Sequence, residues 1–527
     1  MGDERGLIAL VLHAHLPWVR HPEYPSFLEE LWLFEAITET YLPLLDAFER
    51  LARDGVGAQV TLSLSPTLLA MLVDPLLRAR YLRHLESRLE LTERERHRLR
   101  NDPVFEPLAA RQHAIFGEAW RRMNDPGGAD LIGAFADLAD AGVLHLMTTT
   151  ATHGLLPLLA QSPAAVKAQI AVGVAEFHRA FERAPVGMWL PECGYYPGLD
   201  RELAEAGVRF VCLETHALTL AASPPVYGVY APIYCPAGVA AFARDAEASA
   251  QVWSATTGYP ADPAYRDFYR DIGFDLPHEY VRHYLPASGE RAATGVKYHR
   301  IAGSGDRKEP YDPALARATA ARHAADYARR CAETVDRVGA GFDRPPLITV
   351  PFDAELFGHW WHEGPLWIEL LCRELGAGGA VRMIAPDAYL DAHPTNQVTE
   401  PNAGTWGAAG HHEVWLDQSN DWIYRHLHRD AERMTALARS HPEAEGLVRR
   451  ALDQAARELL LAQASDWPFM ISRGTTVGYA TSRVTAHLGR FARLADALER
   501  DAVDEDWLHA VESADNLFPA LDYRVYV

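Results

Sequence analysis

Two acidic residues, Glu192 and Asp353, each close a short apolar run and stand among aromatic and histidine side chains. Glu192 lies in Gly187-Met-Trp-Leu-Pro-Glu192-Cys-Gly-Tyr195, and Asp353 lies in Val350-Pro-Phe-Asp353-Ala-Glu355-Leu-Phe-Gly-His359-Trp360-Trp361. Two carboxyl groups that flank one bond can serve as nucleophile and as general acid/base when their environments separate their pKa values. The pair therefore predicts an enzyme that processes glycosidic bonds.

Each carboxylate also has a structural interpretation, as a helix N-cap or as one partner of an ion pair after a strand. The aromatic surroundings that the two share favour the catalytic interpretation. Glu355 rivals Asp353, because it would share the same face if the strand continued for two more residues. The residues alone leave both open.

Histidines follow other apolar runs. The first run ends in His13-Ala-His15-Leu-Pro17, and alternate residues of a strand share a face, so both imidazoles can enter one pocket. A later run ends near His153, and another ends in Glu214-Thr-His216. A single histidine at a strand end is more often structural than catalytic. Together with the carboxylates, however, these side chains would meet at one rim.

Short apolar runs alternate with helical patterns through about residue 390, and this alternation predicts an α/β protein with a parallel sheet or barrel. Function then belongs at the carboxyl ends of the strands. The expected strands are 7–12, 58–64, 144–148, 187–190, 208–213, 251–254, 347–350 and 381–384. A clear helical period lies between the first two.

Two regions break the alternation. Residues from about 75 to 125 are dense in Arg, Glu and Leu and predict a helical insertion. Strand patterns end near residue 401, and helical patterns follow at 425–439, 443–463 and 483–500. We therefore expect a catalytic domain at 1–401 and an all-helical C-terminal domain at 402–527, since 527 residues exceed one ordinary core.

Composition limits the possible partners and the compartment. The chain has 50 basic and 71 acidic residues, and a net charge of -21 argues against nucleic acid or an anionic membrane. Its five cysteines are scattered and show no CxxC spacing, which indicates neither a disulfide framework nor a zinc cluster. The first apolar run is too short for a signal peptide. We expect a cytoplasmic protein that acts on neutral polysaccharide.

Indole rings cover the apolar faces of sugars well, so tryptophans near the cleft are candidate sugar-binding residues. The candidates are Trp253, Trp360, Trp406 and Trp415. Their structural alternative is ordinary core packing.

Six strings occur in order along the chain. They are His13-Ala-His-Leu-Pro17, Ala151-Thr-His153-Gly, Trp189-Leu-Pro-Glu192-Cys, Gln251-Val-Trp253-Ser-Ala, Pro351-Phe-Asp353-Ala-Glu-Leu-Phe-Gly-His-Trp-Trp361 and Ala464-Ser-Asp466-Trp467-Pro-Phe. This series resembles the motifs of glycoside hydrolase family 57, and more narrowly its α-1,4-glucan branching enzyme group, which is close to the bacterial α-amylase AmyC.

The resemblance implies a distorted (β/α)7 barrel with a helical insertion and a C-terminal helical domain that completes the active-site cleft. By motif position, Glu192 is the nucleophile and Asp353 the general acid/base of a retaining enzyme without metal or cofactor. His13, His15 and His153 line the subsite of the cleaved sugar, and Asp466 reaches a sugar hydroxyl from the helical domain. Arg244 is expected to orient Glu192 and keep it ionised.

The predicted function is a 1,4-α-glucan branching enzyme in glycogen or α-glucan metabolism, with amylose-like chains as substrate. The alternative is α-amylase or 4-α-glucanotransferase action by the same site. The family's best-known branching enzymes carry a long mobile loop with a tip tyrosine over the cleft. Here the connection 216–242 is short and contains prolines, so we expect substantial hydrolysis. Tyrosines available in it are Tyr227, Tyr230 and Tyr234.

Two other classes stay open. A His-x-His at the end of a first strand, with further histidines and a late aspartate, also suits a metal-dependent amidohydrolase. Against it, His411-His-Glu-Val-Trp415 lacks the second histidine of an HExxH motif. A catalytically idle glucan-binding protein would have to lack one of the two carboxylates, and both are present.

Overall fold

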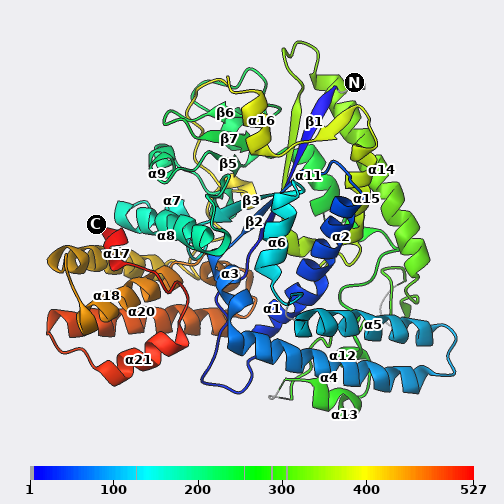
Figure 1. Ribbon diagram of the computed structural model, residues 1–527, viewed down its shortest axis with the longest axis horizontal. Helices are drawn as coiled ribbons and strands as arrows, with labels where there is room; N and C mark the ends of the chain where they lie inside the picture. Colours follow the sequence, from blue (N-terminus) through cyan, green and yellow to red (C-terminus); the bar gives the residue numbers. More distant parts are fainter. Residues whose placement is uncertain (1–4, 126, 255, 287–288, 304–306) are drawn as a thin grey trace.

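The computed structural model describes residues 5–125, 127–254, 256–286, 289–303 and 307–527. In this part of the chain nine strands form one sheet in the order β6-β7-β5-β4-β3-β2-β1-β8, with β9 paired to the start of β1 (Figure 1). The strands are β1 (Gly6–Ala14), β2 (Val60–Leu64), β3 (Leu144–Thr149), β4 (Met188–Trp189), β5 (Phe210–Leu213), β6 (Ile233–Tyr234), β7 (Ala240–Ala243), β8 (Leu347–Asp353) and β9 (Val381–Met383).

Parallel pairing links β7, β5, β4, β3, β2, β1 and β8 in that order. The two ends of this series meet where the backbone N–H of Asp245, just after β7, donates to the carbonyl of Thr349 in β8 at 2.9 Å. The sheet thus curls into a distorted barrel of seven parallel strands. The predicted (β/α)7 class is confirmed.

Helices wrap the outside of the barrel. In the order α9, α8, α6, α2, α15, α14, α11, each contacts the next (Figure 1). Their bounds are α9 (Leu199–Glu205), α8 (Pro163–Phe181), α6 (Leu131–Asp140), α2 (Leu42–Arg53), α15 (Gly364–Gly376), α14 (Pro313–Val338) and α11 (Ala246–Trp253).

Strand β1 shows how the sequence positions the site. Its residues are all buried, and they alternate between two cores. Leu7, Ala9 and Val11 join the cluster inside the barrel, whereas the residues between them join the cluster under the helices. The period of two continues to His13, which therefore points inward at the carboxyl end of the strand. Burial of aliphatic surface on both faces fixes this register.

Two further groups of helices flank the barrel (Figure 1). Helices α4 (Pro75–Leu99) and α5 (Phe105–Asn124) lie side by side, and α4 begins where the Asp74 carboxylate caps the Leu77 N–H. The C-terminal helices are α17 (Trp422–Ser440), α18 (Gly446–Ala462), α19 (Asp466–Arg473), α20 (Val477–Glu499) and α21 (Glu505–Ala514). Helix α17 contacts α8 and the short helix α7 (Leu156–Leu159) of the barrel region. None of the described helices combines the length and the apolar character needed to cross a bilayer.

Shorter helices connect these elements. They are α1 (Glu30–Ala36), a π-helical segment (Ile37–Tyr41), α3 (Pro66–Val73), α7 (Leu156–Leu159), α10 (Thr215–Thr219), α12 (Ile272–Asp275), α13 (His278–Val281) and α16 (Pro386–Ala392).

One predicted strand is wrong. Residues 251–254 end helix α11, because the Asp245 side chain caps that helix at the Ala248 N–H and its first turns are rich in alanine. The true strand at this point is β7, whose residues Ala-Ala-Phe-Ala carry little strand signal. Part of the expected motif, Ala255, lies outside the described residues.

Candidate active site

A cavity of about 1220 Å³ opens at the carboxyl ends of the strands. Every side chain that the sequence singled out as catalytic or substrate-binding lines it: His13, His15, His153, Glu192, Arg244, Trp253, Asp353, Trp360, Trp406, Trp415 and Asp466. His216 does not line it, and instead its ring packs close to Gly404 and Gly410. The topology thus brings together residues that lie up to 453 positions apart, from His13 to Asp466.

Glu192 occupies a sharp turn immediately after β4. Glu192 and Cys193 both have left-handed backbone, with φ of 60° and 51°. Non-glycine residues pay about 1–3 kcal/mol for such conformations, which cluster at functional sites. The turn presents the carboxylate to two donors. Trp406 Nε1–H donates to Oε2 at 2.9 Å, and Ser465 Oγ–H donates to Oε1 at 3.0 Å.

A chain of hydrogen bonds runs from β2 to Glu192. Ser63 Oγ lies 3.0 Å from His13 Nδ1, and His13 Nε2 lies 3.0 Å from His153 Nε2. His153 Nδ1 lies 2.8 Å from Ser465 Oγ. Because Ser465 donates to Glu192, the ring N–H of His153 must donate to Ser465. With neutral rings this fixes every proton, from the Ser63 hydroxyl through His13 to His153.

Burial keeps the two linked imidazoles neutral. It lowers the pKa of His13 well below its usual value, and the nearby charge of His15 lowers it further. The pKa of His153 is lowered well below its usual value for the same reason, with added repulsion from His15 and His13. The His13 ring also stacks on Trp189 at 4.5 Å and 5°. Glu192 therefore faces an oriented, uncharged chain of donors.

The structure separates Asp353 from its rival Glu355. Asp353 pairs in register with His13 across β1 and β8, and both enter the cavity. Glu355 accepts two hydrogen bonds on Oε1, from the Tyr41 hydroxyl at 2.5 Å and from the His15 backbone N–H at 3.2 Å. Within the described residues the Asp353 carboxyl accepts none. Of the two, Asp353 is thus the carboxyl group that accepts no hydrogen bond in the part of the chain that the structure describes.

The two carboxyl groups differ in their electrostatic surroundings. Burial raises the pKa of Glu192 to about 7, and the hydrogen bonds from Trp406 and Ser465 oppose the rise. Burial also raises the pKa of Asp353 well above its usual range, and the negative charges of Glu355 and Glu192 raise it further. Donors thus favour the ionised form of Glu192, whereas acidic neighbours favour the protonated form of Asp353.

Arg244 does not make the expected contact. Its guanidinium forms an ion pair with Glu214, and the hydrogen bonds that Glu192 accepts come from Trp406 and Ser465. Arg244 acts on the other carboxyl group instead, because its positive charge lowers the pKa of Asp353. The expectation failed because Arg244 follows β7, next to the end of β5 that carries Glu214.

His15 and Asp466 contact each other in the wall of the cavity. His15 Nε2 lies 3.1 Å from Asp466 Oδ2, and His15 Nδ1 has no hydrogen-bond partner among the described residues. Together with His153 they offer ligand atoms within 4.8 Å of one another, which is the spacing of a metal site. To ligate a metal, however, His153 would have to give up its bond to Ser465 or to His13.

The candidate tryptophans fall into two kinds. Trp253 and Trp360 are 47% and 54% exposed, so their rings are open to a ligand. Trp406 is half-buried, and its ring lies 6.0 Å from that of Trp253. Trp415 borders the cavity but is only 2% exposed and packs on Leu155 and Val414. Its role in the structure is mainly that of a core residue.

Three residues of the site were not predicted from the sequence: Ser63, Tyr41 and Ser465. Ser465 stood in the motif Ala464-Ser-Asp466 but attracted no attention, because a lone serine beside an aspartate carries no signal. Ser63 lies in the middle of an apolar strand, and Tyr41 belongs to the helical pattern 31–48. Ser63 faces inward in register with His13, and that register is a signal that could have identified it.

Family models match most of the chain. One described as glycosyl hydrolase family 57 matches residues 9–401, and one described as 1,4-alpha-glucan branching enzyme, C-terminal, matches residues 426–526.

Similar proteins extend over the full length. The structure of the α-amylase AmyC from Thermotoga maritima is 41% identical, with 99% of each chain covered and a TM-score of 0.93. The structure of the branching enzyme TK1436 from Thermococcus kodakaraensis is 32% identical, with 99% of this chain and 96% of that chain covered and a TM-score of 0.89. A probable 1,4-alpha-glucan branching enzyme from Mycobacterium tuberculosis is 31% identical, with 98% of each chain covered.

Proposed function

The chain belongs to glycosyl hydrolase family 57, and we propose that it is a retaining 1,4-α-glucan branching enzyme that also hydrolyses a substantial share of the bonds it cleaves. The observation that carries this proposal is the pair Glu192 and Asp353. The two share one aromatic-lined cavity, and among the described residues only Glu192 receives hydrogen bonds on its carboxylate. Two relatives that match nearly the whole chain are named branching enzymes, which supports the same function.

The geometry supports the following roles in the two half-reactions. Glu192, ionised by its two donors, attacks the anomeric carbon of the bound glucan, while Asp353 gives its proton to the glycosidic oxygen of the departing chain. In the second half-reaction Asp353 takes a proton from the 6-hydroxyl of an acceptor chain, and the Glu192 ester is displaced. Transfer to that hydroxyl makes an α-1,6 linkage. Transfer to water makes a new reducing end.

Hydrolysis is favoured by the short connection between β5 and β7. None of its candidate tyrosines lines the cavity. The Tyr227 hydroxyl donates to Asp343 at 2.7 Å, Tyr230 packs against the core, and Tyr234 belongs to β6. The covalent intermediate therefore has no tyrosine lid from this segment, and water can compete with the acceptor. The similarity to an α-amylase agrees with this second activity.

Residues 402–527 have a catalytic part in this proposal. Asp466, the first residue of α19, lines the cavity, and Ser465 just before it donates to Glu192. The Ser465 backbone N–H donates to the His153 carbonyl at 3.0 Å, and Gln169 Nε2 donates to Gln463 Oε1 at 3.0 Å. These bonds tie the helical region to the barrel at the nucleophile.

The test is product analysis on amylose. New α-1,6 linkages, counted after debranching, measure transfer, and new reducing ends measure hydrolysis. We expect both, in comparable amounts. Reducing ends without any α-1,6 linkage would reject the branching activity, and abundant branches with almost no net reducing ends would reject the hydrolytic share.

We also propose a cytoplasmic location, which is supported by five buried cysteines that are all free thiols. Thiol labelling of the denatured, unreduced protein should find five reactive groups. A disulfide in that sample would contradict the proposal.

A further inference from the structure

The loop between α11 and α12 forms one wall of the active-site cavity and presents two neighbouring aromatic side chains there. Phe268 and Tyr269 both line the cavity. Tyr269 is 79% exposed, so its ring is open to a ligand, and burying it would be favourable. The Phe268 ring stacks on Trp360 at 4.5 Å and 28°, and its edge meets the Tyr269 ring at 5.1 Å. Phe268 thus contacts both of the other rings, and we call the three residues the Phe268 platform.

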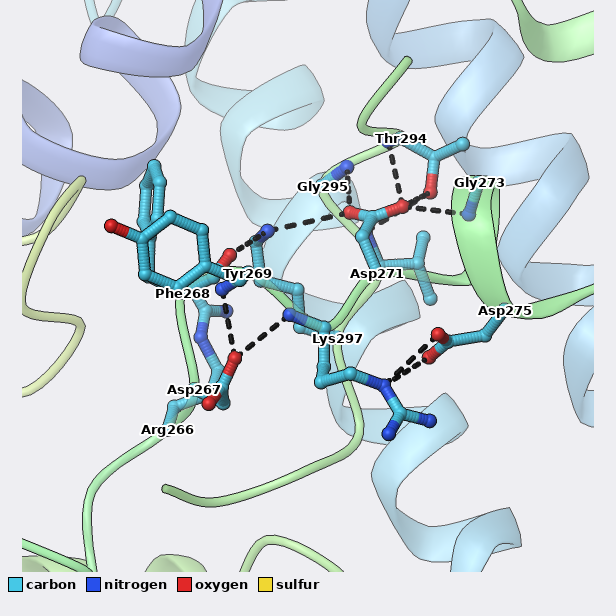
Figure 2. A network of polar contacts seen from close by, with 12 residues as sticks. Arg266, Asp267, Phe268, Tyr269, Asp271, Gly273, Asp275, Thr294, Gly295 and Lys297 are labelled. Atoms are coloured by element: carbon cyan, nitrogen blue, oxygen red, sulfur yellow. Dashed lines mark hydrogen bonds and ion pairs between the residues drawn. The ribbon is translucent and has the colours of Figure 1, made fainter. Parts of the chain in front are cut away.

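A buried polar network anchors this loop (Figure 2). The Asp271 carboxylate accepts from the backbone N–H groups of Gly273, Thr294 and Gly295 at 2.8–2.9 Å and from the Thr294 hydroxyl at 2.7 Å. Lys297 Nζ pairs with Asp271 at 3.5 Å and donates to the Phe268 carbonyl at 2.6 Å.

A second anchor holds the residue next to the platform. Asp267 Oδ1 accepts from the backbone N–H groups of Tyr269 and Arg270, both at 2.8 Å, and Lys308 pairs with its other oxygen. Figure 2 shows both aromatic rings on the same side of the network, away from Asp271. The anchors fix the backbone that carries the rings, so little ordering is left for a ligand to impose.

The Trp360 side of the platform is fixed just as firmly. Gly358 has a φ of 119°, and a Cβ there would lie 1.9 Å from the Glu39 carbonyl, so only glycine fits. The following His359 ring Nδ1 lies 2.7 Å from Glu39 Oε2, and the His359 ring meets Phe268 edge-on at 5.3 Å. The turn that carries Trp360 begins directly after Asp353.

We propose that Phe268, Tyr269 and Trp360 bind the acceptor glucan, and that exposed Tyr269 determines how well a sugar competes with water for the intermediate. This inference rests on the proposed function. The chain that leaves in the first half-reaction and the chain that enters in the second both place a sugar next to the acid/base, because that group exchanges a proton with their hydroxyl oxygen. Trp360 belongs to the turn that follows Asp353, and Phe268 stacks on it, so we place the platform on that side.

The donor side has its own aromatic surface. The Trp406 indole N–H donates to the nucleophile Glu192. The centre of the Trp253 ring lies 6.0 Å from the centre of the Trp406 ring. Covalently bound donor therefore extends along Trp406 and Trp253, whereas the Phe268 platform serves the opposite direction. The enzyme would thus hold the acceptor glucan on anchored aromatic rings, where a mobile lid would otherwise cover it.

The experiment uses a maltooligosyl fluoride as donor, whose fluoride leaving group does not occupy the acceptor side. Transfer to a borohydride-reduced maltooligosaccharide is measured against its concentration. A stacked ring contributes roughly 0.5–1.5 kcal/mol, so Tyr269→Ala should raise the half-saturating acceptor concentration roughly 2- to 13-fold. Fluoride release into water alone should keep its wild-type rate. Tyr269→Phe keeps the ring face and should behave as wild type.

Tyr24→Ala is the matched control, since Tyr24 is an exposed tyrosine that does not line the cavity. An unchanged acceptor dependence in Tyr269→Ala would overturn the proposal, and so would an equal fall in fluoride release. If wild-type enzyme transferred nothing at any acceptor concentration, the branching function would fail instead. The platform would then be judged by the KM for maltooligosaccharide cleavage, because the departing chain lies on the same side; an unchanged KM in Tyr269→Ala would reject it.

Discussion

The hydrogen bonds to Glu192 should set the pH at which the enzyme begins to work. Trp406→Phe keeps an aromatic ring and removes the N–H that donates at 2.9 Å, and Ser465→Ala removes the hydroxyl that donates at 3.0 Å. A hydrogen bond to a charged group contributes about 1.5–3 kcal/mol, and one pKa unit corresponds to about 1.4 kcal/mol. Each variant should therefore raise the pKa of Glu192 by about one to two units above its value of about 7.

The direction of the pH shift follows from the proposed role of Glu192 as the nucleophile. In the proposed mechanism only ionised Glu192 attacks, so kcat/KM should rise with pH through the pKa of this carboxyl group, and a higher pKa should move the rise to higher pH. At pH 7, where wild-type Glu192 is about half ionised, each variant should lose about 5- to 50-fold in kcat/KM, and alkaline buffer should restore most of it. A maltooligosyl fluoride is the right substrate, because fluoride leaves with little help from an acid and the profile then reports the nucleophile.

Trp253→Phe is the control for this prediction. It also alters an indole of the cavity wall, but Trp253 makes no hydrogen bond to Glu192 in the described structure. This variant should change KM without shifting the pH at which kcat/KM rises. Suppose that Trp406→Phe and Ser465→Ala both fold with wild-type melting temperatures and that kcat/KM rises at the same pH as in wild type. Hydrogen bonding then does not determine the charge of Glu192.

Further outcomes follow from the same structure. Glu192→Gln should lower turnover by three orders of magnitude or more with an unchanged fold. Azide should partly rescue Asp353→Ala, because this anion can displace the Glu192 ester without a general base and so form a glucosyl azide. Near-normal rates in either variant without azide would remove the assignment. Chelator-treated enzyme should stay active with less than stoichiometric metal by elemental analysis, whereas a required, tightly held zinc would revive the metal-hydrolase alternative at His15, His153 and Asp466. Asp271→Ala leaves buried donors unpaired and should lower the free energy of unfolding by about 3–5 kcal/mol, while Asp275→Ala at an exposed ion pair with Arg270 should cost under about 1 kcal/mol by denaturant titration.

The parts of the site that follow strand periodicity could be predicted from the sequence. Alternation along β1 places His13 inside, and parallel order brings Glu192 and Asp353 to the same end of the barrel. These inferences need only short apolar runs and the rule that function gathers at the carboxyl ends of strands. Asp466 is different, because helical packing places it there and only the motif resemblance pointed to it.

The remaining parts depend on contacts that no local pattern records. The partner of Arg244 is Glu214, a choice made by the neighbouring ends of β5 and β7. Trp253 reaches the cavity at the end of a capped, alanine-rich helix, although the hydrophobic run there indicated a strand. The Phe268 platform was missed because its loop has no period, and its geometry comes from buried Asp271 and Lys297.

Burial alone does not distinguish the two catalytic candidates, because it raises the pKa of Glu192 and of Asp353 alike. The distinction comes from what each carboxyl group can bond to. Glu192 ends a chain of donors whose imidazoles are neutral, so it receives an oriented proton at one oxygen and an indole N–H at the other. Asp353 receives no donor within the described residues and faces two acidic groups, one of which, Glu355, is held in place by Tyr41 and His15. In the proposed mechanism the proton therefore belongs on Asp353, the carboxyl group that must protonate the departing chain.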